Sequence, residues 1–209
     1  MFKKVGLLSV VVTVFISCYP MGTFQGPGVL EEGEETVGIG FSWMTNATSL
    51  VDTTTTGKTA FVADGSLLFR RGFSNNTEIG LKFVGRPWAN GSTLIDGKWQ
   101  ALQKPFLVAV GFGISYWSAD GIQPYVGYHP AVFVGEDKLF FVAQYNYSHS
   151  VNNISKTTDL LVGKRVFLED GGGIILPFFG LHRAESDPAN VFYSLGFGFS
   201  LPLETAFSN

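Results

Sequence analysis

Apolar and polar residues alternate with period two along most of the chain after residue 34. Between residues 35 and 44 the large apolar side chains occupy every second position: Val37, Ile39, Phe41 and Trp43. The positions between them are glycine and serine. Successive side chains of a β-strand point to opposite faces, so this pattern predicts strands whose two faces differ in chemistry.

Ten segments carry this alternation, and short polar or glycine-rich stretches separate most of them. The predicted strands are residues 35–44, 60–71, 77–89, 92–102, 105–117, 122–134, 138–147, 157–168, 172–183 and 190–203. They predict an all-β fold, a single antiparallel β-barrel of about ten strands that takes up residues 35–209; a count of about 8–12 strands fits the same pattern.

Charge is concentrated on one of the two faces. In the first five predicted strands and in the last, the face with the large aromatic residues carries no charged residue between its first and last positions. The opposite face of strands two to four carries six: Asp64, Arg70, Lys82, Arg86, Asp96 and Lys98. A soluble barrel would turn its apolar face inward, whereas a membrane barrel turns it to lipid. We therefore predict a transmembrane barrel with these charges in the lumen and with four rings facing lipid: Phe41, Phe83, Phe112 and Phe197.

The lengths of the connections predict which way the barrel faces. The two longest, residues 45–59 and 148–156, follow the first and seventh strands, and tight turns follow the even-numbered strands. Outer-membrane barrels have short periplasmic turns and longer external loops, which predicts a periplasmic N-terminus. Six aromatic residues then end odd-numbered strands and form an external girdle: Trp43, Trp88, Tyr116, Trp117, Tyr145 and Tyr147.

The first residues have the pattern of a secretory signal. Lys3 and Lys4 precede an apolar run that is shorter than the roughly 20 residues of a membrane-spanning helix. Phe15-Ile16-Ser17-Cys18 then resembles a bacterial lipobox. This resemblance implies that residues 1–17 are removed and that Cys18 carries a lipid, with residues 18–34 as a polar linker that ends in an acidic run. An ordinary signal peptide with an incidental cysteine is the alternative.

The composition agrees with a membrane barrel and limits the chemistry. Charged residues make up 15% of the chain, against about 25% in soluble proteins. The net charge of −3 gives no reason to expect nucleic acid as a partner. Cys18 is the only cysteine, which excludes an internal disulfide and a cysteine-rich metal site.

The last predicted strand carries a resemblance to a known class. Its residues 194–201, SLGFGFSL, are similar to the C-terminal insertion signal of small Gram-negative outer-membrane β-barrels, although that class usually ends on this strand and residues 202–209 continue here. The resemblance implies an integral outer-membrane protein that contacts outer-membrane lipid and uses the barrel-insertion machinery during biogenesis.

A barrel of about ten strands is narrow, because eight strands already leave an interior filled by side chains. We expect the charged lumen residues to pair and plug the barrel, which favours a structural or surface-interaction role. Two alternatives stay open. One is a narrow channel or ligand-binding barrel for small solutes, and the other is a soluble periplasmic ligand-binding barrel tethered by lipid.

The histidines do not predict a catalytic or metal site. His129 is expected in the lumen, and His149 is expected in the connection after the seventh strand. His182 lies near Glu185 and Asp187, which is ordinary loop chemistry. Their spacing matches no zinc site, no phosphate-binding loop is present, and we expect neither enzyme activity nor a cofactor.

The eighth predicted strand places a cation on the lipid face. If Leu160 and Val162 face lipid, Lys164 does as well, and in the other register Arg165 does. A charge at the membrane midplane costs about 2–4 kcal/mol, so we expect this side chain to extend to the periplasmic rim.

Overall fold

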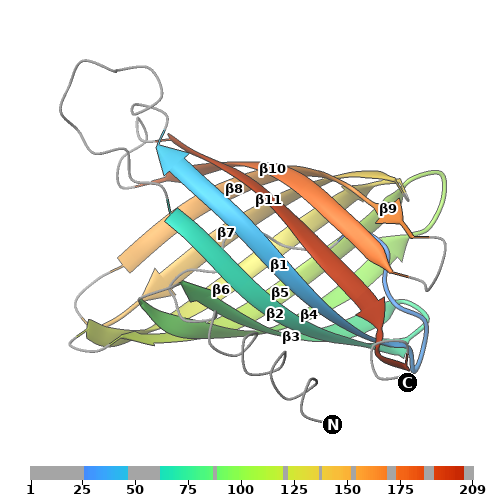
Figure 1. The fold of residues 1–209 in the computed structure, drawn as a ribbon, viewed down its shortest axis with the longest axis horizontal. Helices are drawn as coiled ribbons and strands as arrows, with labels where there is room; N and C mark the ends of the chain where they lie inside the picture. Colours follow the sequence, from blue (N-terminus) through green and yellow to red (C-terminus); the bar gives the residue numbers. More distant parts are fainter. Residues whose placement is uncertain are drawn as a thin grey trace, which may run out of the picture.

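The computed structural model describes residues 26–46, 62–86, 89–119, 122–136, 138–151, 154–168, 173–185 and 191–204. Its strands are β1 (Glu35–Asn46), β2 (Val62–Ser74), β3 (Thr77–Arg86), β4 (Ala89–Leu102), β5 (Leu107–Ala119), β6 (Ile122–Gly135), β7 (Leu139–His149), β8 (Ile154–Lys164), β9 (Val166–Phe167), β10 (Ile174–Ala184) and β11 (Val191–Pro202). Each pairs with its neighbours in antiparallel register, and β11 also pairs with β1, so the sheet closes into a barrel (Figure 1). The predicted all-β barrel is confirmed.

Strands β8 and β9 together fill one position in the ring, which gives ten positions in all. Both pair with β10 in the same register, Phe178 with Gly163 and Ile174 with Phe167. The break between them at Arg165 lies beside Pro177 of β10, which has no N–H to donate to a neighbouring strand. The pattern had predicted one continuous strand here.

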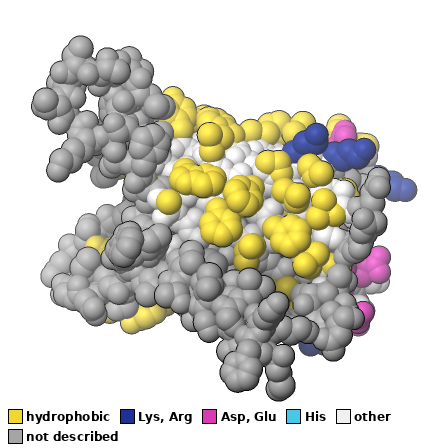
Figure 2. Space-filling view, in the orientation of Figure 1, with side chains coloured by type: hydrophobic (Ala, Val, Ile, Leu, Met, Phe, Trp, Pro, Cys, Tyr) yellow, Lys and Arg dark blue, Asp and Glu magenta, His cyan; other side chains and the backbone are white. Residues whose placement is uncertain are grey.

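The two faces of the sheet differ as the alternation predicts. Phe83, Phe112 and Phe197 are 38%, 51% and 40% exposed on the outer wall, and Phe41 packs against Phe197 with ring centroids 5.5 Å apart. Figure 2 shows hydrophobic side chains covering the wall over β10, β11 and β1, with charged side chains gathered at the end where β11 finishes. None of the described residues lies in a helix that is long and apolar enough to cross a membrane.

We call the end where β1 begins and β11 ends the proximal end. Short connections join strands there, at residues 75–76 between β2 and β3 and at residues 103–106 between β4 and β5. Strand β1 ends and β2 begins at the opposite, distal end, and residues 47–61 between them are outside the described residues. Lys164 is exposed on the outer face at the proximal end of β8, as expected, and the side chain of Arg165 turns to the lumen.

Part of the lumen is filled by apolar side chains, which the sequence analysis did not predict. The buried cluster consists of Leu68, Ala109, Ala131, Phe133, Phe140, Val142, Leu161, Leu176 and Phe178. Its three rings each lie over a glycine of the adjacent strand: Phe133 over Gly111, Phe140 over Gly163, and Phe178 over Gly196. These three glycines of the inner wall therefore make room for rings and do not line an open passage.

The segment before β1 is only partly the exposed linker that the sequence predicts. Residues 31–34 are exposed, and the backbone turns at Gly33, whose φ is 82°. Gly33 N donates to Gly72 O, and Gly72 N donates to Glu34 O, at 3.0 and 2.9 Å. Residues 26–30 instead enter the proximal end of the barrel, where Gly26 and Pro27 are buried. The predicted signal peptide and Cys18 lie outside the described residues.

Candidate functional site

Four ionised side chains from β2, β3 and β4 form a network in the proximal half of the lumen, the charged cluster: Arg70, Glu78, Asp96 and Lys98. Arg70 Nη2 lies 2.8 Å from Glu78 Oε1 and 2.8 Å from Asp96 Oδ1, and Lys98 Nζ lies 2.8 Å from Glu78 Oε1. All four side chains are buried or nearly so. Two cations and two anions therefore satisfy one another, as buried charges require.

The charged cluster includes three of the six predicted lumen charges. Lys82 lies deeper, within electrostatic reach of Asp64 and Asp96, and both Lys82 and Asp64 are buried. The side chain of Arg86 is outside the described residues. Glu78 was missed, although it shares the inward face of β3 with Lys82 and its place in the alternation was the available signal.

The charged cluster also binds the chain's own N-terminal segment, which we define as residues 26–30. Lys98 Nζ donates to Gly26 O at 2.9 Å and to Gly28 O at 2.6 Å. Glu78 Oε2 accepts from Leu30 N at 2.9 Å. Main-chain groups of the segment thus complete the coordination of two buried charges.

A second polar network runs along the distal half of the inner wall, with one side chain from each of six neighbouring strands. This histidine relay consists of Ser115 (β5), His129 (β6), Asn146 (β7), Asp159 (β8), His182 (β10) and Ser194 (β11). All six side chains are buried. Cross-strand register brings them together, which sequence spacing alone does not reveal.

The hydrogen bonds of the relay have one consistent direction. Asn146 Nδ2 donates to Asp159 Oδ2 at 2.6 Å, because a carboxylate only accepts. Asn146 Oδ1 therefore accepts from His129 Nδ1 at 2.7 Å, and His129 Nε2 accepts the hydroxyl proton of Ser115, also at 2.7 Å. Gln144 Nε2 is a second donor to Asn146 Oδ1. Every side chain here has a role fixed by its neighbours.

At the other end of the relay, Asp159, His182 and Ser194 follow one another as Asn146, His129 and Ser115 do. In both sets an amide or carboxylate faces an imidazole, which in turn faces a hydroxyl. Asp159 Oδ1 lies 3.0 Å from His182 Nδ1, and His182 Nε2 lies 2.7 Å from Ser194 Oγ. Gly180 makes room for this pair, since a Cβ there would lie 2.5 Å from Ser194 Oγ. The expected neighbours of His182, Glu185 and Asp187, are thus replaced by residues on adjacent strands; Asp187 itself is outside the described residues.

A serine, a histidine and a carboxylate in this order are also the groups of acyl-transfer enzymes. Here Asp159, His182 and Ser194 are 2%, 2% and 1% exposed, and none of them lines either cavity described below. The facing Asp159 and His182 atoms, although 3.0 Å apart, are not aligned as a hydrogen bond. This geometry offers no accessible nucleophile. The described residues include no cluster of three histidine, cysteine or acidic side chains suited to a metal.

The predicted aromatic girdle is divided between the two faces. Trp43 and Tyr116 are exposed on the outer wall, and Tyr145 and Tyr147 share the outward face of β7, all toward the distal end. Trp117 instead has the inward position of Ser115 and packs on Tyr125 with ring centroids 4.9 Å apart, so its assignment to the girdle is wrong. Trp88 is outside the described residues.

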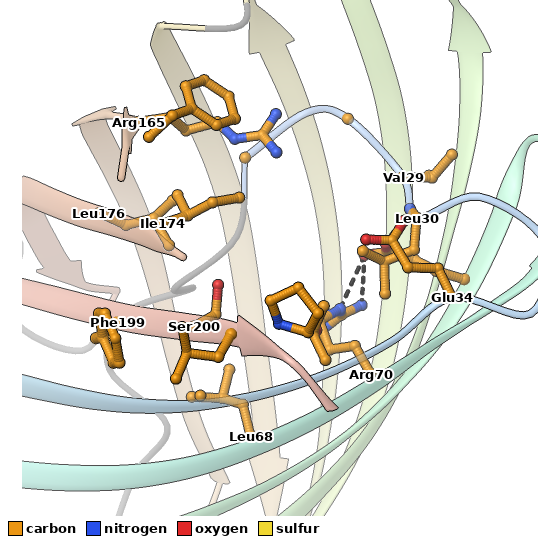
Figure 3. Close-up of a pocket in the computed structure, with 18 of the residues that line it drawn as sticks. Val29, Leu30, Glu34, Leu68, Arg70, Arg165, Ile174, Leu176, Phe199 and Ser200 are labelled. Atoms are coloured by element: carbon orange, nitrogen blue, oxygen red, sulfur yellow. Dashed lines mark hydrogen bonds and ion pairs between the residues drawn. The ribbon is translucent and has the colours of Figure 1, made fainter. Parts of the chain in front are cut away.

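Two cavities adjoin these networks. The larger, about 290 Å³, lies at the proximal end between the N-terminal segment and an apolar wall that includes Leu68, Ile174 and Leu176 (Figure 3). The smaller, about 30 Å³, has room for about one or two water molecules and lies between the charged cluster and the relay. Its polar lining is Lys82, Asp96, His129 and Gln144. No described feature is a wide pore.

Comparison with known proteins supports the fold. No protein-family model matches the chain, and no curated protein does. Among solved structures, the COG4313 outer membrane channel from Pseudomonas putida F1 is similar, with a TM-score of 0.54, 8% identity, and coverage of 90% of this chain and 100% of that one. The KdgM porin has a TM-score of 0.42, 9% identity, and coverage of 78% and 98%. Neisserial surface protein A has a TM-score of 0.33, 10% identity, and coverage of 81% and 99%.

The first of these likenesses shows that this chain has the fold of an outer-membrane β-barrel. At 8% identity it does not carry over a solute, a partner or an activity.

Proposed function

We propose that the chain is an integral outer-membrane β-barrel whose lumen is closed and whose role is structural or surface interaction. The observation that carries this proposal is the filling of the interior. The charged cluster, the N-terminal segment and the three rings over glycines fill the proximal part, where Lys98 Nζ lies 5.3 Å from the centre of the Phe133 ring, and the histidine relay lines the distal half.

The chemistry of the filling supports closure. Opening a solvated path through the charged cluster requires the separation of Arg70 from Glu78 and Asp96, which are each 2.8 Å away. These separations give up charge-assisted contacts that hold the three side chains together in the lumen. A path along the glycine wall would require the displacement of buried rings, which are close-packed against their neighbours. Because each route to an open lumen requires the loss of such contacts, we propose that the closed lumen is the stable state.

The remaining parts of the proposal concern the membrane. The exposed apolar wall supports contact with outer-membrane lipid, and the short proximal connections support a periplasmic N-terminus. We further propose lipidation at Cys18, passage through the barrel-insertion machinery, and a closed barrel that needs no cofactor, binds no nucleic acid and carries out no catalysis.

Planar-bilayer recording of refolded protein tests closure. We expect no steady single-channel steps under conditions in which a porin gives them. Reproducible unitary steps from the wild-type protein would replace this proposal with the narrow-channel function. That alternative draws on the proximal cavity of about 290 Å³ and on the channel named among the similar structures.

Membrane fractionation tests the solvent in which the protein folds. After Cys18→Ser, an integral barrel is expected to resist carbonate extraction and to keep heat-modifiable migration on gels. Release of the variant into the carbonate wash would support instead the soluble, lipid-tethered alternative. Mass analysis of the wild-type N-terminus tests lipidation separately.

A further inference from the structure

The N-terminal segment, residues 26–30, crosses the proximal mouth of the barrel as a curved stretch of chain with a bend at Pro27. Figure 3 shows the chain arching across the mouth, with Arg165 on one side and Arg70 on the other. The segment also borders the cavity of about 290 Å³, which Gly26, Gly28 and Leu30 line in part. It therefore covers a space that the barrel wall by itself leaves open.

Recognition of the segment uses its main chain. Lys98 donates to the carbonyls of Gly26 and Gly28, and Glu78 accepts from the N–H of Leu30. Donors and an acceptor at fixed positions along an extended chain are the general means by which a groove binds a peptide. The segment is thus bound as a ligand of the lumen.

The two glycines fit a close approach by Arg165. A Cβ at Gly26 would lie 2.9 Å from Arg165 Cδ, and one at Gly28 would lie 3.0 Å from Arg165 Nη1. Pro27 between them is fully buried. Side chains larger than hydrogen at these two positions would have to displace the Arg165 side chain from the segment.

Release of the segment would leave no buried charge alone. Lys98 keeps Glu78 at 2.8 Å, and Arg70 keeps Glu78 and Asp96. The lost contacts are main-chain hydrogen bonds, which water can replace at an open mouth. The barrel wall is therefore complete without the segment, and binding of the segment is separable from folding of the barrel.

We propose that residues 26–30 are a removable plug, held by Lys98 and Glu78, whose release opens the proximal cavity to solvent. This inference rests on the proposed closed lumen and names the part of it that moves. The proximal end is the periplasmic end in the orientation proposed above, so the plug is released toward the periplasm.

Thiol labelling of the full-length chain tests the plug. In a Cys18→Ser background, Pro27→Cys places a single thiol inside the mouth, and Glu32→Cys places one on the exposed part of the same segment. We expect a bulky water-soluble maleimide to label residue 32 at least tenfold faster than residue 27. Equal rates would overturn the proposal, because the segment would then lie outside the barrel.

Substitutions of Lys98 and Lys82 form a matched pair that tests whether Lys98 holds the segment in place, which we call its role as the latch. Adding Lys98→Met to the Pro27→Cys chain should speed labelling at residue 27 at least tenfold. Adding Lys82→Met should leave the rate within about twofold of the parent, because Lys82 is also a buried lumen lysine but makes no described contact with the segment. Equal effects of the two substitutions would overturn the assignment of Lys98 as the latch.

If Lys98→Met fails to fold, as judged by gel migration, a substitution within the segment itself provides the test instead. Gly26→Val with Gly28→Val leaves the barrel wall untouched and should give the same acceleration at residue 27. Protection unchanged by this pair would overturn the proposal. Bilayer recording of the parent is independent of labelling: conduction by the wild-type protein contradicts the closed lumen, whereas failed labelling contrasts contradict the plug alone.

Discussion

The charged cluster and the histidine relay fill opposite halves of one lumen with different chemistry. The cluster joins two cations and two anions on three adjacent strands, next to the proximal mouth. The relay spans six strands with a single carboxylate, Asp159, and otherwise uses hydroxyls, an amide and imidazoles. Charge is concentrated where a segment outside the wall adds main-chain partners, and hydrogen bonds between side chains of the wall itself line the other half.

The largest expected effect comes from unbalancing the charged cluster. Glu78→Gln removes the anion that lies 2.8 Å from both Arg70 and Lys98 and leaves two buried cations with one anion. We expect a loss of about 3–5 kcal/mol in the free energy of unfolding, measured by urea denaturation in lipid vesicles.

A surface ion pair provides the control for that measurement. Glu35 pairs with Arg71 at 3.0 Å, but the two side chains are 38% and 67% exposed. Glu35→Gln should therefore change the unfolding free energy by no more than about 1 kcal/mol. Similar losses from both substitutions would show that burial does not distinguish the cluster.

The next effect concerns the only carboxylate of the relay. Asp159→Asn removes the charge that faces His182 and orients the amide of Asn146. A loss of about 1.5–3 kcal/mol is expected, because the hydrogen bond from Asn146 loses its charged acceptor. A loss as large as that of Glu78→Gln would contradict the distinction between an ionic and a mainly neutral half.

The packing of rings over glycines in the lumen gives a third prediction. Gly163→Ala places a methyl group against the Phe140 ring, and overpacking of this kind costs about 1–3 kcal/mol. Because the nearest contacts are all with that ring, Phe140→Leu in the same chain should recover part of the loss. A double-mutant cycle measures the coupling, and strictly additive effects would show that the ring does not rest on this glycine.

The smallest effects lie at the two ends of the relay. Ser115→Ala and Ser194→Ala each remove one hydroxyl that lies 2.7 Å from a histidine Nε2. Each should cost about 0.5–1.5 kcal/mol, and the two losses should add because the serines share no partner. If one of the two losses lies within this range and the other lies outside it, the two ends of the relay are not equivalent.

Sequence alternation was sufficient to predict the wall of this molecule. The inward and outward positions of Phe41, Asp64 and Lys82 follow from period two, because lipid and lumen impose opposite chemistry on alternate residues. The exception among the described girdle residues, Trp117, belongs to a pair of adjacent aromatics, where alternation allows only one of the two to face lipid.

The partners inside the lumen were beyond the reach of the pattern. His182 meets Ser194 on the next strand and Asp159 on the strand before, at sequence separations set by register and strand tilt. Nothing in the polar stretch before β1 distinguishes the buried Pro27 from the exposed Glu32, because both lie in a segment without period. These contacts depend on how the strands close into a ring, and the local sequence pattern does not encode that closure.

The pairing of β1 with β11 has a consequence for how the protein is made. The first strand receives its second neighbour only when the last strand of the chain arrives, so every shorter intermediate keeps two unpaired edges. Such edges are not tolerated in hydrocarbon. Residues 26–30 precede β1 with only the turn at residues 31–34 between them, so they are synthesised before the last strand and before the final seam can form. The segment can therefore enter the ring before its wall is finished.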